Sequence, residues 1–191
     1  MLQLVKIDFL LIVVALLVSL IAIIERRESS RFSLFLLLSH LTLFYAIRLF
    51  KIVKLNPVES LILSNVSMLI ELTFYFTILH FLIQNVKRKT YLKVFFLIYL
   101  VYAIVNALFI QPLDNGYSNY SFVLGSVFIL ICILFYFIEQ LEGDGYRTVF
   151  KNFWVWYAAA LFIFLATEIP IMSLLNHLLQ TQRSDHGFKK A

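Results

Sequence analysis

Long apolar stretches, separated by short polar segments, run through the whole chain. Each stretch has about the 20 residues that a helix needs to cross the hydrocarbon core of a bilayer. The predicted helices span residues 4–24, 32–50, 58–83, 92–110, 121–141 and 153–169. We therefore expect an all-α polytopic transmembrane helical bundle of about six spanning helices. It would form a single unit over residues 1–182, followed by a polar tail at 183–191.

Two prolines indicate where predicted helices begin or end. Pro57 suits the first position of the third helix, because a residue at that position needs no amide partner. Pro170 should kink or end the sixth helix, because proline removes an internal hydrogen bond. Residues 171–180 would then continue as an interfacial turn.

Composition supports the membrane class. Of the 191 residues, 62% are hydrophobic and 14% are charged, whereas a soluble domain has about 45–50% apolar and about 25% charged residues. The net charge of +5 comes from basic residues that lie between the apolar stretches, as membrane topology requires. We therefore expect the lipid bilayer, and no nucleic acid, as a partner. The single cysteine, Cys132, excludes an intrachain disulfide and a cysteine metal cluster.

Basic residues are unevenly divided between the predicted loops. The loops after helices one, three and five contain Arg26, Arg27, Arg31, Lys87, Arg88, Lys89, Lys93, Arg147 and Lys151. The loops after helices two and four contain three at most, Arg48, Lys51 and Lys54. Because basic loops stay in the cytoplasm, this division predicts an outside N-terminus. Six helices also place the basic C-terminal tail outside, which this rule does not favour.

A polar stripe runs along the third predicted helix. At 100° per residue, its members fall within about 80° of one another. They are Ser60, Ser64, Ser67, Glu71 and Tyr75. Glu71 lies near the middle of the apolar stretch, where a charge costs between about 3 and 10 kcal/mol. The stripe should therefore face protein, and we expect the opposite face to contact lipid. That face carries Leu61, Leu69, Leu72, Phe76 and Leu79.

His40 and Glu71 are expected at similar depth in the membrane. Counted from Leu55 in the turn between them, they lie about equally far along neighbouring antiparallel helices, within about 2 Å in depth. One interpretation is a proton relay or a ligand anchor. The other, which we favour, is a polar contact that fixes helix register, completed by Ser67 or Tyr75. The candidate intramembrane polar site comprises His40, Ser64, Ser67, Glu71 and Tyr75.

Small and polar residues also recur along the fifth predicted helix. Gly125, Cys132, Tyr136 and Glu139 follow one another mostly at helical spacings. Small residues at such spacings are more often used for helix packing than for ligand binding. We expect these four residues to form an outward interface with a second copy of the chain or with a membrane or cytoplasmic protein.

Signatures of catalysis are missing from the sequence. Neither an HExxH nor a GxSxG motif is present. His40, His80, His177 and His186 are too dispersed to predict a metal site. We therefore expect a protein that is not an enzyme and that carries no metal or cofactor.

A resemblance covers about a third of the chain. Gln111 and Tyr120 bracket a polar loop, a Gly125–Ser126 pair follows, and Phe153–Trp154 opens the last helix. These elements resemble a loose family of uncharacterised small polytopic bacterial inner-membrane proteins. The resemblance implies a small helical module of the bacterial inner membrane, sometimes seen as the sensor part of larger signalling proteins.

Three functions remain open from the sequence. The first is a sensory, signalling or accessory membrane module that acts through helix–helix or ligand contacts. The second is an oligomer that conducts protons or small solutes by means of His40 and Glu71. The third is a membrane effector or accessory of antiviral defence, for which a small membrane protein is suited.

Overall fold

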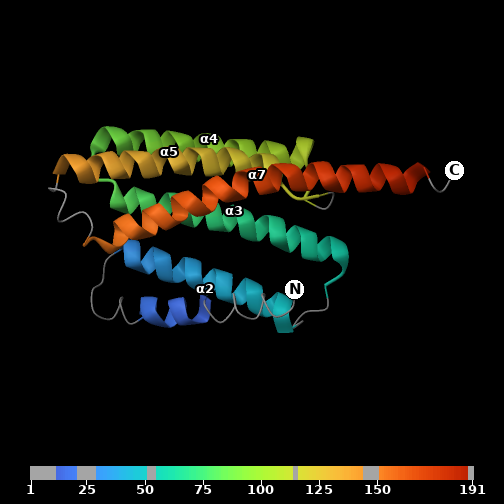
Figure 1. Ribbon diagram of the computed structural model, residues 1–191, viewed down its shortest axis with the longest axis horizontal. Helices are drawn as coiled ribbons and strands as arrows, with labels where there is room; N and C mark the ends of the chain where they lie inside the picture. The colour runs from blue at the N-terminus through green and yellow to red at the C-terminus, as the bar shows by residue number, and fades with distance from the viewer. Residues whose placement is uncertain (1–11, 21–28, 51–54, 114–115, 144–150, 189–191) are drawn as a thin grey trace. The chain divides into compact units, whose positions relative to one another are not determined.

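The computed structural model describes residues 12–20, 29–50, 55–113, 116–143 and 151–188. Over these residues the chain is helical and contains no strand. The elements are α2 (Ser29–Phe50), α3 (Pro57–Leu82), α4 (Val86–Val105), the π-helix η1 (Asn106–Ile110), α5 (Asn119–Gly143) and α7 (Phe153–Phe188), as Figure 1 shows. Within the described residues, five segments are long and apolar enough to cross a membrane. The predicted all-α, membrane-spanning architecture is confirmed. Of the first predicted helix, 4–24, residues 12–20 are described and are helical.

By its internal contacts the chain divides into two compact units, Met1–Leu82 and Ile83–Ala191. In the first unit α2 packs against α3. In the second unit α5 packs against both α4 and α7.

The beginning of α3 agrees with the prediction from Pro57, which is the first residue of the helix. Asn56 and Glu59 cap this end reciprocally. The Glu59 amide donates to Asn56 Oδ1 at 2.8 Å, and the Asn56 amide donates to Glu59 Oε2 at 2.9 Å. Two amides that the helix itself cannot satisfy are thereby satisfied.

Helix α4 begins earlier than predicted, at Val86 rather than at residue 92. The Asn85 side chain accepts hydrogen bonds from the amides of Lys87 and Arg88, at 3.0 and 3.3 Å. Asparagine is among the best N-cap residues, and lysine and arginine are good helix formers. The basic residues that we had assigned to a loop therefore form the first turns of the helix.

Helix α7 runs through Pro170 to Phe188, whereas we had predicted a helix over 153–169 and a separate turn at 171–180. Pro170 lies near the middle of this 36-residue helix, and Figure 1 shows α7 changing direction about half-way along. A proline bends a membrane helix without ending it when other groups satisfy the freed backbone. At about 1.5 Å per residue α7 is about 54 Å long, so it exceeds the roughly 30 Å hydrocarbon core. Most of the predicted tail, up to Phe188, is helical.

The core of the second unit follows one face of α5. Ile129, Cys132, Ile133 and Tyr136 are at most 1% exposed and recur at spacings of three and four residues. On the α4 side, Phe95 stacks on Phe128 with ring centroids 4.8 Å apart. Such spacing places all four α5 residues on the side of the helix that meets its neighbours.

Helix α3 is buried on two faces. The polar stripe is largely buried, and so is the face that we expected to contact lipid: Leu72, Phe76 and Leu79 are at most 1% exposed. The expectation of a lipid-facing surface at these three residues is wrong. Its failure has a simple cause, because lipid tails and protein interiors are equally apolar and accept the same side chains.

Candidate functional site

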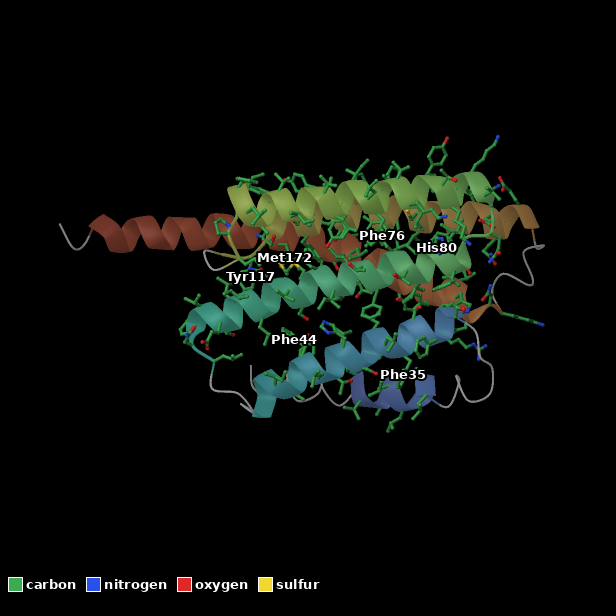
Figure 2. The ribbon with its side chains drawn as sticks, turned by 180° about the vertical axis from the view of Figure 1, so that it is seen from behind. Phe35, Phe44, Phe76, His80, Tyr117 and Met172 are labelled. Carbon is green, nitrogen blue, oxygen red and sulfur yellow. The ribbon has the colours of Figure 1, made fainter. Side chains whose placement is uncertain are left out.

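The candidate site on α2 and α3 is built around His40. Its Nε2 atom lies 3.0 Å from Ser67 Oγ, which connects the two helices near the middle of each. The His40 ring also lies beside Phe74, with ring centroids 6.5 Å apart. Ser67 is 4% exposed, so this contact lies inside the protein. Figure 2 shows the aromatic side chains of Phe35 and Phe44 along the same helix, α2.

Glu71 lies one turn after Ser67 on α3. The Tyr75 hydroxyl donates a hydrogen bond to Glu71 Oε1, and Tyr75 is itself buried. The carboxyl group is thus held on its own helix by a residue four positions later, a spacing that places the two side chains next to each other. The structure therefore brings His40 to Ser67 and Glu71 to Tyr75 along one stripe.

Ser64 is buried but takes a local role. Its hydroxyl donates to the Ser60 carbonyl at 2.9 Å, within α3. Back-bonding of this kind satisfies a hydroxyl inside an apolar helix and needs no ligand. Of the five residues predicted for the site, Ser64 is the one whose side chain bonds to a backbone carbonyl rather than to another side chain.

Asn65 is fully buried on α3 and is a polar residue that the sequence reasoning missed. It shares a face with Leu72, Phe76 and Leu79 rather than with the serines. The signal that could have revealed it was the presence of an amide in an otherwise apolar face, because such a group is costly unless it is hydrogen-bonded.

The four residues predicted as an interface on α5 are arranged differently from the expectation. Gly125, Cys132 and Tyr136 are buried within the chain, so they do not form an outward surface. Small and aromatic residues alternate here because α5 packs against both α4 and α7. The stripe is a packing seam of the second unit.

Glu139, the fourth of these residues, closes the turn before α4. Its Oε1 atom accepts hydrogen bonds from the amides of Gln84 and Asn85, at 2.7 and 2.9 Å. One turn further, Glu142 forms an ion pair with Arg88, with the closest atoms 2.8 Å apart. Carboxylates next to a helix N-terminus are favourable, because the first amides of a helix carry a partial positive charge.

The other end of the second unit is held by amide side chains. Asn106 Nδ2 donates to Ser118 Oγ at 2.9 Å, and Asn119 Nδ2 donates to the Met172 carbonyl of α7. Figure 2 labels Tyr117 and Met172, which mark this end. Asn106 begins η1, where the Gln111 amide bonds to the Asn106 carbonyl at 2.7 Å. The polar loop around Gln111 is therefore anchored to three helical segments.

Within the described part of the chain, no three His, Cys, Asp or Glu side chains lie close enough together to hold a metal ion. The polar groups instead join helix to helix or helix to turn. No protein-family model matches the chain, and no curated protein or solved structure is significantly similar to it.

Proposed function

We propose that this chain is a non-enzymatic integral membrane module that acts by contact, as a sensory, signalling or accessory protein. The observation that carries the proposal is the His40–Ser67 contact, which places a polar side-chain pair between two spanning helices. Polar contacts inside a membrane fix how helices pack. A signal that breaks or strengthens such a contact changes the preferred packing and is passed on to whatever contacts the helices.

The proposed location is the bacterial inner membrane, with the beginnings of α2, α4 and α7 in the cytoplasm. Basic residues support this orientation because they gather at those beginnings. Arg31 lies in the first turn of α2, Lys87 in that of α4, and Lys151 just before α7. The resemblance in the Gln111–Trp154 region supports a bacterial origin and a sensor-like role.

Photo-crosslinking in native membranes tests the contact role. A photoreactive residue would replace exposed side chains on three helices, Leu43 on α2, Leu97 on α4 and Ile163 on α7, each at least 61% exposed. Buried Ile133 on α5 provides the control position. We expect a product of discrete mass, chain plus chain or chain plus one partner protein, from at least one exposed position and not from Ile133. Products with lipid alone from every exposed position would contradict the proposal.

A second candidate, proton or small-solute conduction, is favoured by the order of polar groups along the stripe. His40 contacts Ser67, Glu71 follows one turn later, and Tyr75 donates to Glu71. Titratable side chains that line up inside a membrane are the usual elements of proton relays. Purified chain in liposomes with a potassium diffusion potential and an internal pH dye should then acidify the lumen, and Glu71→Gln should abolish this flux. Glu59→Gln, at the exposed start of α3, is the matched control.

A further inference from the structure

The first two turns of α4 carry three lysines that form no ion pair with any acidic residue in the described part of the chain. We call Lys87, Lys89 and Lys93 the lysine cluster. Two described carboxylates reach this end of the helix, and both are engaged elsewhere. Glu142 pairs with Arg88, and Glu139 accepts from the turn before the helix. Among the described residues no ion pair involves the lysine cluster.

The lysine cluster lies where α4 enters the membrane. The candidate spanning segment runs from Val86 to Ile110. At about 1.5 Å per residue it is longer than the roughly 30 Å hydrocarbon core, so its first turns belong at headgroup depth. The side chains of Lys87 and Lys93 are exposed, as is Tyr91 between them. Asn85 already satisfies two of the first amides of α4, so the lysine side chains are the groups left to bind an anion. Tyrosine is enriched at this depth because its ring is apolar and its hydroxyl is polar.

An exposed apolar stripe continues from the lysine cluster down α4. Its members recur at spacings of three and four residues and are all at least 46% exposed. We call this set the α4 stripe; it comprises Val94, Leu97, Val101 and Ile104 on α4 and Leu108 on η1. At about 1.5 Å per residue the stripe is about 21 Å long, which is more than half of the roughly 30 Å hydrocarbon core. A headgroup at the lysines would therefore have its acyl chains along the stripe.

We propose that the start of α4 is a binding site for an anionic phospholipid, whose phosphate headgroup is attracted by the charge of the lysine cluster and whose acyl chains lie on the α4 stripe, with Lys87 and Lys93 on either side of that stripe. Clustered basic residues next to a spanning helix attract anionic lipid headgroups, and each contributes about five-fold in affinity. The stripe selects a lipid over a free phosphate ion, because an ion gains nothing from apolar contact. The site depends neither on the orientation of the chain nor on its signalling role.

The test is native mass spectrometry of the full chain released from detergent, titrated with phosphatidylglycerol or with phosphatidylcholine of the same acyl chains. The wild-type chain should bind phosphatidylglycerol at least ten-fold more tightly than phosphatidylcholine. The variant Lys87→Gln/Lys89→Gln/Lys93→Gln should lose about 100-fold of that affinity, while the corresponding Arg variant should stay within a few-fold. Inorganic phosphate at equal concentration should not displace the lipid.

A charge-matched variant, Arg183→Gln/Lys189→Gln/Lys190→Gln, removes three basic residues outside the cluster and should bind as the wild type does. Equal affinity for the two lipids, unchanged binding by the lysine-cluster variant, or an equal loss in the charge-matched variant would overturn the proposal. Displacement by phosphate would also overturn it, in favour of a free-anion site. If the triple variant does not fold, Lys87→Gln and Lys93→Gln should each lose about five-fold, and no loss in either would count against the site.

Discussion

His40 Nε2 and Ser67 Oγ lie 3.0 Å apart and join α2 to α3 near the middle of both helices. Lipid offers no polar partner at this depth, so each group depends on the other. Helices that are otherwise apolar slide or rotate past one another at little cost, whereas a hydrogen bond between them fixes one register. A change in this contact would therefore act directly on how α2 and α3 pack.

The His40–Ser67 contact should appear as a coupling energy. A double-mutant cycle of His40→Phe and Ser67→Ala, measured by reversible unfolding in bicelles, should give about 0.6 kcal/mol and at most about 2 kcal/mol. Ser39→Ala is the control, since the Ser39 hydroxyl bonds to the Phe35 carbonyl of its own helix. A coupling for Ser39 as large as that for Ser67 would show that the cycle measures something other than the contact.

Glu71→Gln should fold. The amide oxygen of glutamine accepts the Tyr75 hydrogen bond that Glu71 accepts now, and a neutral group is less costly in the membrane. Fluorescence-detected size-exclusion chromatography should show a monodisperse peak of wild-type height for Glu71→Gln. For Glu71→Leu the peak should be lower, because leucine cannot accept the Tyr75 hydrogen bond. An aggregated Glu71→Gln protein would mean that the structure needs the ionised carboxylate.

Glu139 should matter more for stability than Glu142. Replacing Glu139 by Ala removes the acceptor of two backbone amides, which should cost about 0.5–2 kcal/mol, as loss of a helix cap does. Glu142→Ala removes a pair whose acidic side chain is 60% exposed, and exposed pairs contribute little. Thermal unfolding of both variants in the same detergent shows which of them loses more stability. A larger loss of Tm for Glu142→Ala would contradict it.

Single cysteines in a Cys132→Ser background should report the orientation. Cysteines at exposed Lys87 and Lys151 should be protected from an impermeant maleimide in intact spheroplasts, and one at exposed Glu59 should be labelled. The reason is that basic residues are in excess on the side of the membrane where Lys87 and Lys151 lie, and such a side is cytoplasmic. Cys132 itself is fully buried and should stay unlabelled in the folded wild-type chain even after lysis. Labelling of the cysteine at position 87 before lysis would show that the chain has the opposite orientation.

Helix type and the beginning of α3 could be predicted from the sequence because they depend on local chemistry. Apolar length determines what can span a membrane, and Pro57 suits a helix start. Counting residues from the turn also placed His40 near the polar stripe of α3, because the rise per residue is constant along both helices.

Tertiary structure decided which face of each helix is buried. Leu72 and Phe76 are buried where lipid contact was expected, and Cys132 lies in a packing seam where an outward interface was expected. Lipid and protein interiors attract the same apolar side chains, so the pattern of residues cannot tell them apart. The contacts of Glu139 with the turn before α4, 54 and 55 positions away along the chain, likewise arise only when α4 and α5 pack together.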